Sequence, residues 1–196
     1  MNDFFQVFGL ERRLAVDTTA LQRRFYELSR QWHPDFHQAR PPAEQARALE
    51  ESARVNAAYR AVRDPLARVE YLIRLEEGRE TREGAAVKPK APPDLLAEMF
   101  EIQESLEEAR SGVLDDATRA TLTEQRDGLR SRMTEAERDV TGPLSQAWDA
   151  AAPANRAAAL NGLKDALATR AYLRTVIDDL TAALGEEETH VAHRRD

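Results

Sequence analysis

The residues best suited to chemistry lie in one short stretch, Ser29–Gln38, which reads SRQWHPDFHQ. It holds two of the four histidines of the chain, His33 and His37, and Pro34 separates His33 from Asp35. A histidine beside a carboxylate can form an acid–base pair, because imidazole exchanges its proton near neutral pH. With His37 added, the stretch also offers three metal-ligating side chains at positions i, i+2 and i+4.

Both chemical roles need partners that the sequence does not place nearby. A general base acts in a pocket that excludes water, beside a nucleophile and an orienting group, and no Gly-x-Ser-x-Gly or glycine-rich phosphate motif is present. A metal would need another ligand, and the remaining histidines, His190 and His193, lie close to the C-terminal end of the sequence. Two other roles stay open: His33 could cap the preceding helix while Asp35 caps a turn, or the tripeptide could be a docking surface.

Basic residues precede the tripeptide. Arg23, Arg24 and Arg30 are interrupted by a single acid, Glu27. Arg23 and Arg30 are seven residues apart, which is two helical turns, so they share a face. A positive helix face beside a stiff loop suits the docking of an acidic protein, although charge alone is more typical of a solvated face.

The spacing of apolar residues predicts helices on both sides of the tripeptide. Asp17 is a typical N-cap, and the helix after it should end near Trp32, because Pro34 disfavours the α conformation in the residue before it. Pro42 and Asp64-Pro65 are expected to begin the next two helices. The expected inward residues of the helix after Pro42 are Leu49, Ser52, Val55, Tyr59 and Val62. Residues 1–76 are therefore predicted to form a helical hairpin, flanked by two shorter helices, whose connecting loop carries the tripeptide.

Residues 77–93 lack periodicity and are rich in Gly and Pro, which predicts a linker. Beyond it, residues 94–185 are predicted to form a three-helix bundle, and the polar residues 186–196 a disordered tail. The first helix of the bundle has the strongest stripe, with steps of four and three residues: Leu95, Met99, Ile102, Leu106, Ala109 and Val113. Asp115-Asp116 can cap the second helix, Gly142-Pro143 should kink or break it, and the third helix begins after Pro153.

A second set of residues on the first bundle helix falls away from this stripe. At about 100° per residue, Leu96 and Phe100 lie at about 100° and 140° from the stripe, and Ala97 at about 200°. Three carboxylates share this outer face: Glu101, Glu104 and Glu108. Exposed apolar side chains with an acidic rim form a suitable partner-binding patch, unless the bundle core is wide enough to cover Leu96 and Phe100.

Composition narrows the classes of function. Residues 1–76 carry 12 Arg and 11 Asp or Glu, a net charge of +1, whereas the other 120 residues carry 16 Lys or Arg and 24 Asp or Glu, a net charge of −8. This acidic balance disfavours nucleic-acid binding. The absence of cysteine excludes disulfides and thiolate metal sites. No signal peptide or membrane span is expected, so a cytoplasmic protein without cofactor is predicted.

The stretch Tyr26–Asp35 (YELSRQWHPD), with a helix on each side, resembles a J-domain. The wider pattern is similar to the HscB-type co-chaperones of iron–sulfur cluster assembly: DFFQVFGL at the start, NAAYRAVRDPLARVEYLIRL at residues 56–75, and an acidic helical domain after a short linker. The resemblance implies a two-domain, all-α co-chaperone that performs no chemistry itself. It would stimulate ATP hydrolysis by an HscA-like heat-shock-70 chaperone and deliver an IscU-like scaffold.

The resemblance also implies roles for residues. His33, Pro34 and Asp35 would trigger hydrolysis, and Arg23, Arg24 and Arg30 would steer the approach. Tyr26 and Glu27 stand where many J-domains have basic residues, which favours a dedicated HscA-like partner. The implied scaffold-binding residues are Leu96, Ala97, Phe100, Glu101, Glu104, Glu108 and Tyr172; Ala97 departs from the larger apolar residue common in the family. The alternative is a J-domain co-chaperone that serves a different client.

Overall fold

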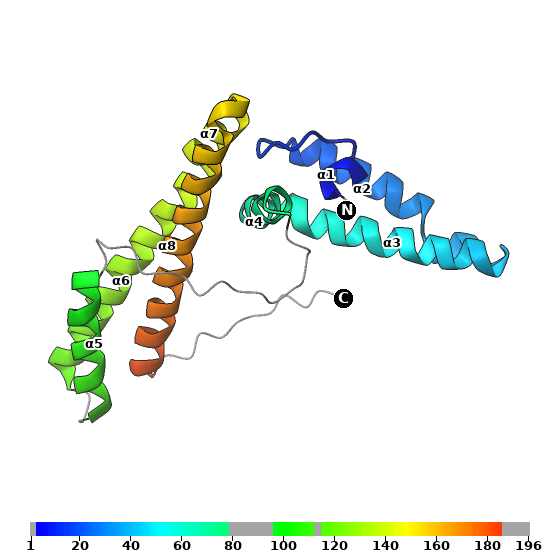
Figure 1. Ribbon diagram of the computed structural model, residues 1–196. Helices are drawn as coiled ribbons and strands as arrows, with labels where there is room; N and C mark the ends of the chain where they lie inside the picture. The colour runs from blue at the N-terminus through cyan, green and yellow to red at the C-terminus, as the bar shows by residue number, and fades with distance from the viewer. Residues whose placement is uncertain (1–2, 79–95, 112–114, 186–196) are drawn as a thin grey trace. The chain divides into compact units, whose positions relative to one another are not determined.

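The computed structural model describes residues 3–78, 96–111 and 115–185, and all regular structure within these ranges is helical (Figure 1). The predicted all-α class is therefore confirmed. The chain divides into two compact units: residues 1–85 with 139–164, and residues 86–138 with 165–196. The first unit thus includes a segment, residues 139–164, that the sequence assigned to the second domain. The predicted linker and tail fall almost wholly outside the described residues.

The hairpin of the first unit consists of α2 (Thr18–Gln31) and α3 (Pro42–Arg63), which pack against each other. Helices α1 (Phe4–Val7) and α4 (Pro65–Glu76) both pack on α3 (Figure 1). The helix boundaries follow local signals. The Asp17 carboxylate accepts hydrogen bonds from the amides of Thr19 and Ala20, and α2 ends at its C-cap Trp32. Proline occupies the first position of α3 and of α4, where a missing N–H costs nothing.

The inward face of α3 differs from the predicted one at its N-terminal end. Leu49 was expected in the core, but it is 63% exposed, and Ala48 beside it is fully buried. Further along the helix, Val55 and Val62 are buried as predicted. Hydrophobicity ranks Leu above Ala, but the side that faces the neighbouring helices is set by packing, and a small side chain lets two helices approach closely.

The remainder of the first unit begins with a π-helical turn, Val140–Leu144, which contains Pro143. The helix is distorted there but does not end, since α7 (Ser145–Ala150) follows directly and the Ser145 hydroxyl donates to the Val140 carbonyl. The Asp149 carboxylate on α7 accepts hydrogen bonds from the amides of Leu14 and Ala15, each at 2.8 Å. These long-range bonds help to explain why residues 139–164 belong to the same unit as the hairpin.

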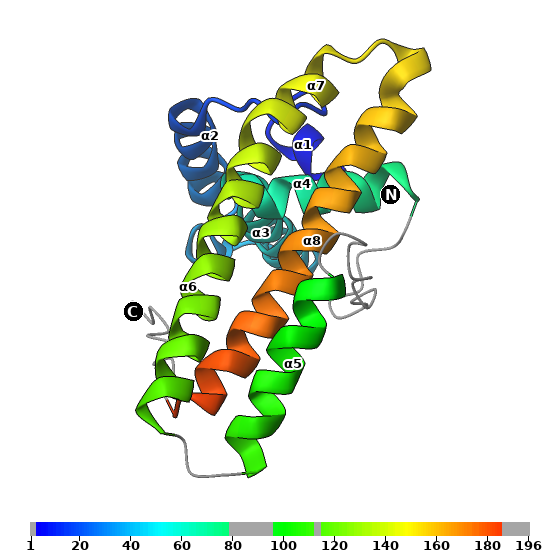
Figure 2. The same cartoon turned by 90° about the vertical axis from the view of Figure 1, so that its left-hand side faces the viewer.

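The second unit contains α5 (Leu96–Ser111), most of α6 (Asp116–Asp139) and the larger part of α8 (Arg156–Ala183), side by side in Figure 2. All three helices contribute to one buried cluster, so the predicted three-helix packing is confirmed. The cluster consists of Ile102, Leu106, Leu122, Leu129, Leu173, Val176, Ile177, Leu180 and Leu184.

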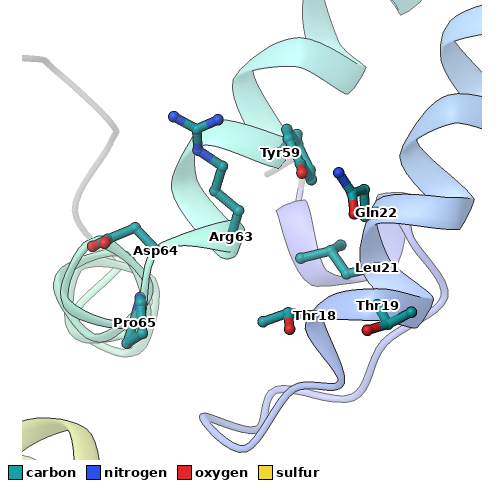
Figure 3. Close-up of a pocket in the computed structure, with 8 residues that line it drawn as sticks. All are labelled: Thr18, Thr19, Leu21, Gln22, Tyr59, Arg63, Asp64 and Pro65. Atoms are coloured by element: carbon teal, nitrogen blue, oxygen red, sulfur yellow. The ribbon is translucent and has the colours of Figure 1, made fainter. Parts of the chain in front are cut away.

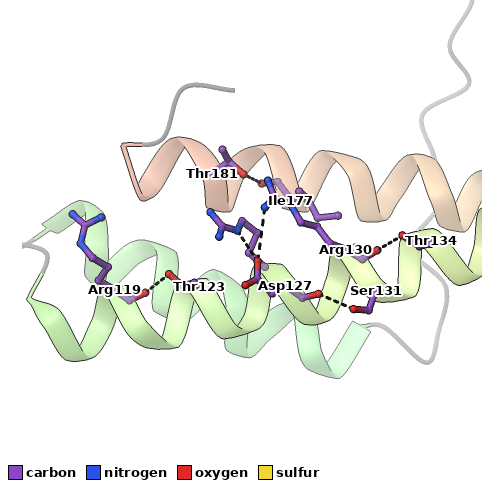
Figure 4. A network of polar contacts seen from close by, with 9 residues as sticks. Arg119, Thr123, Asp127, Arg130, Ser131, Thr134, Ile177 and Thr181 are labelled. Atoms are coloured by element: carbon purple, nitrogen blue, oxygen red, sulfur yellow. Dashed lines mark hydrogen bonds and ion pairs between the residues drawn. The ribbon is translucent and has the colours of Figure 1, made fainter. Parts of the chain in front are cut away.

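Polar contacts line the same bundle (Figure 4). Arg126 is almost fully buried, and its Nε lies 3.1 Å from Oδ1 of Asp127. Arg130 approaches the same oxygen at 3.8 Å. The Thr181 hydroxyl is buried and donates to the Ile177 carbonyl. Asp127 therefore faces two cations from its own helix, one of them buried.

The cap at the start of α6 predicts a pH-dependent stability. The Asp115 carboxylate accepts a hydrogen bond from the Thr118 amide at 2.7 Å, and this bond lowers the pKa of Asp115 below its usual value of 3.8. A lowered pKa means that the stabilisation is complete above the unfolded-state pKa and is lost as the pH falls through the folded-state pKa. Asp115→Asn also caps but cannot titrate. We therefore measure the melting temperatures of wild type and Asp115→Asn from about pH 6 downwards. The wild type should lose stability relative to the variant progressively below about pH 4. A difference between the two that stays constant with pH would contradict this assignment.

Candidate functional site

The tripeptide lies in the connection between α2 and α3, residues 33–41, which we call the HPD loop. Its centre is a 3-10 turn, η1 (Pro34–His37), and His33 is the N-cap of that turn. The His33 side chain accepts a hydrogen bond at Nδ1 from the Asp35 amide, at 3.3 Å. Pro34 at the first position holds the backbone in the conformation that this turn requires. Local chemistry thus explains the shape of the loop.

The side chains of His33 and Asp35 point into solvent, with exposed fractions of 51% and 70%. The His33 Nδ1 atom lies 3.6 Å from the Asp35 carboxylate. The two contacts of Nδ1 are alternatives, because accepting the amide requires a free lone pair and the ion pair requires a proton there. Neither residue lines the pocket of the first unit described below. The arrangement suits recognition by another surface more than acid–base chemistry, which needs excluded water.

His37 has a different role. Its Nε2 lies 3.0 Å from the carbonyl oxygen of Gln31, the last residue of α2. The sequence left open that His33 caps this helix; in the structure His37 makes the contact, and His33 caps the following turn. Within the described residues, no group of three or more His, Cys, Asp or Glu side chains is arranged to hold a metal ion.

The three arginines of α2 are all exposed, but they differ in their surroundings. Arg24 pairs with Glu27 at 2.9 Å. Neither Arg23 nor Arg30 forms an ion pair with any residue that the structure describes. Tyr26, which is 62% exposed, is three residues after Arg23 and four before Arg30, so it lies on the same face. Sequence analysis did not select Tyr26 as a binding residue, although its spacing from the two arginines was visible.

A second exposed aromatic, Phe36, follows the tripeptide directly. It is 65% exposed, and its ring meets the His33 imidazole edge-on with centroids 5.8 Å apart. No helical periodicity in the sequence could predict that Phe36 is exposed, because this residue lies in a 3-10 turn of only four residues.

The second candidate site is the outer face of α5. Phe100 is 73% exposed, and Glu101 and Glu104 beside it are exposed as well. Ile102 and Leu106 are buried in the bundle, so the predicted division of this helix into two faces is confirmed where its side chains are described. The side chains of Leu96, Ala97 and Glu108 lie outside the described residues.

Tyr172, the aromatic that the resemblance implies for scaffold binding, is half-buried on α8 and packs against the core cluster of the bundle. Burial raises the pKa of its hydroxyl. Some of this side chain contributes to the core, and the exposed remainder is available to a partner.

An open hollow of about 370 Å³ is found elsewhere in the first unit (Figure 3). It lies between the start of α2 and the junction of α3 with α4, and none of the HPD residues lines it. Its lining residues are Thr18, Thr19, Leu21, Gln22, Tyr59, Arg63, Asp64 and Pro65.

Among the residues described, no helix combines the length and apolar character needed to cross a bilayer.

Comparison with known proteins agrees with this architecture. The HSCB C-terminal oligomerisation domain matches residues 91–180. The human co-chaperone protein HscB is similar in structure, with a TM-score of 0.60 and 25% sequence identity over 93% of this chain and 82% of that chain. Chaperone HscB from Vibrio cholerae has the same fold, with a TM-score of 0.51 and 24% identity over 91% of this chain and 99% of that chain.

A helical hairpin that exposes an HPD loop, on a chain that also carries a three-helix bundle, is the arrangement expected of a J-domain co-chaperone. The match of residues 91–180 and the structural similarity to human HscB make this chain similar to the HscB-type co-chaperones.

Proposed function

We propose that this protein stimulates ATP hydrolysis by an HscA-like heat-shock-70 chaperone and delivers to it an IscU-like scaffold for iron–sulfur clusters. The protein itself would carry out no chemical step. The observation that carries the proposal is the HPD loop, whose His33 and Asp35 side chains are presented to solvent by a defined turn. The match of residues 91–180 to the HSCB C-terminal domain supports the assignment of the client.

The chaperone would contact the HPD loop and the adjoining face of α2. Asp35 would pair with a cation of the chaperone, because its carboxylate is exposed and, among the described residues, contacts only His33 at 3.6 Å and Gln38 at 3.3 Å. Arg23 and Arg30 would supply attraction towards an acidic surface. Arg24 is proposed for the same surface, but its bond to Glu27 reduces the charge that it presents.

The scaffold would bind the outer face of α5. Phe100 is the most exposed large apolar side chain described, and exposed aromatics are frequent anchors of protein interfaces. Glu101 and Glu104 would form an acidic rim around it, together with Glu108 as implied by the family. Leu96 and Ala97 would extend the apolar centre of the patch, likewise as the family implies. Tyr172 would contribute from α8.

The proposal can be tested by single-turnover ATP hydrolysis with the HscA-like chaperone of the same organism. The rate is measured with this protein alone, with the scaffold alone and with both. Stimulation that rises further when the scaffold is added would support both parts of the proposal. Stimulation that does not respond to the scaffold would retain the co-chaperone role and indicate a different client. A rate unchanged by this protein would contradict the proposal.

Charge steering by α2 leads to a prediction about salt. Exposed charges are screened beyond about 8–10 Å at physiological ionic strength, so stimulation at subsaturating concentration should fall as salt rises from about 0.05 to about 0.5 M. Each of the variants Arg23→Ala, Arg24→Ala and Arg30→Ala lowers the net charge of this surface by one unit, Arg24→Ala by leaving Glu27 without its partner, so each should flatten the salt response to a similar extent. The measurement is the same ATPase assay along a salt series. Salt responses as steep as that of the wild type in all three variants would contradict steering by this face of α2.

A further inference from the structure

The HPD loop is held by side chains that lie outside the tripeptide. Gln45, near the start of α3, donates from Nε2 to two backbone carbonyls of the loop, that of Gln38 at 3.0 Å and that of Arg40 at 2.8 Å. His37 reaches in the other direction, with Nε2 at 3.0 Å from the Gln31 carbonyl at the end of α2. The loop is therefore tied to both helices of the hairpin.

Ring contacts support the His37 contact. Its imidazole stacks on the Trp32 indole, with centroids 6.2 Å apart and planes inclined by 14°. The guanidinium of Arg47 on α3 lies over the same indole, at 5.6 Å from its centroid. Trp32 is the C-cap of α2, one residue before His33. This stack joins the end of α2, the loop and α3 immediately beside the tripeptide.

The backbone bonds of the loop span only one turn each. The Phe36 amide donates to the His33 carbonyl at 3.0 Å, and the Arg40 amide donates to the His37 carbonyl at 2.9 Å. Such bonds define a turn but do not anchor it to its surroundings. The ties from Gln45 and His37 provide that anchoring, because they connect the loop to helices that pack against each other.

We propose that Gln45 and His37 are positioning residues for the HPD loop, which they hold in the conformation that the chaperone binds. The inference rests on the proposed chaperone-activating function. A loop that spends only a fraction of its time in the binding conformation has an apparent affinity reduced by that fraction. Loss of either tie should therefore raise the concentration needed for stimulation, while a saturating concentration still restores the full rate.

Gln45→Glu separates this role from helix stability. Glutamate has nearly the same shape as glutamine but no donor, so it would turn an acceptor towards the carbonyls of Gln38 and Arg40. Its negative charge near the N-terminal end of α3 is favourable for the helix itself. Gln45→Lys retains a donor and serves as the matched rescue. His37→Phe keeps a ring against Trp32 and removes the donor to Gln31.

The experiment titrates each full-length variant into single-turnover ATP hydrolysis by the chaperone and measures amide hydrogen exchange in residues 33–40. We expect Gln45→Glu and His37→Phe to raise the half-maximal concentration about 3- to 10-fold, with the maximal rate retained. The Phe36 and Arg40 amides should exchange faster in Gln45→Glu, whose melting temperature should not fall. Gln45→Lys should resemble the wild type in both measurements.

The outcomes are distinguishable. Suppose that the wild type stimulates the chaperone, but Gln45→Glu leaves either the half-maximal concentration or the amide exchange unchanged. That result would overturn the positioning role and leave the proposed function intact. Equal defects in Gln45→Glu and Gln45→Lys would also overturn it, because the donor would then not be the relevant property. Absence of stimulation by the wild type would contradict the proposed function, and the inference with it.

Discussion

Asp35→Asn should abolish the stimulation of ATP hydrolysis while leaving the melting temperature nearly unchanged. Removal of one charge from a desolvated interfacial pair costs roughly 2–5 kcal/mol, which weakens a complex at least about 30-fold. The free protein should tolerate the change, because the side chain is 70% exposed. The asparagine Oδ1 can still accept the hydrogen bond that Gln38 donates to Asp35 at 3.3 Å. The measurements are single-turnover ATP hydrolysis and thermal unfolding of the same samples.

Asp178→Asn is the matched control. Asp178 lies on α8, is exposed to a similar degree and has a weak contact at 4.0 Å with Arg174. The variant makes the same change in net charge as Asp35→Asn, so it should stimulate the chaperone like the wild type. A large drop in the melting temperature of Asp35→Asn would instead show that Asp35 mainly stabilises the turn.

Phe100→Ala should weaken scaffold binding by about 30-fold or more, because truncation of a hot-spot aromatic costs about 2 kcal/mol or more of binding free energy. The stability of the bundle should change by no more than about 0.5 kcal/mol, because Phe100 is 73% exposed. Ile102→Ala, two residues further on the same helix, removes a side chain that is 1% exposed. That variant should cost about 2–5 kcal/mol of unfolding free energy. Binding is measured by calorimetry with the scaffold, and stability by denaturant unfolding.

Leu49→Ala controls for the loss of exposed apolar surface. Leu49 is 63% exposed but lies on α3 in the first unit, so its removal should leave scaffold affinity unchanged. Strong destabilisation by Phe100→Ala would place this side chain in the bundle core. Unchanged affinity in a stable Phe100→Ala variant would move the scaffold site away from the outer face of α5.

The boundaries of the helices could be predicted from sequence because each depends on a few neighbouring residues. Asp17 and Asp64 cap the amides of the next turn, and proline starts α3 and α4. The two faces of α5 were predictable for the same reason, since a period of 3.6 residues places Ile102 inward and Phe100 outward. The HPD tripeptide was recognisable as a candidate site because its three residues are contiguous.

Contacts between distant segments could not be predicted in this way. The Asp149 carboxylate binds the amides of Leu14 and Ala15 across more than 130 residues of sequence, and no local pattern marks that pairing. Long-range packing also decides that Ala48 rather than Leu49 faces inward on α3. It likewise brings residues 139–164 into one unit with the hairpin.

The HPD loop shows the division most clearly. Sequence alone determined which residues form the turn, because proline and a capping histidine act within four residues. Tertiary structure decided which histidine closes α2 and which side chain of α3 holds the loop carbonyls. Those contacts depend on how the hairpin brings its two helices together, and a side chain can donate only to the acceptors that packing places within its reach.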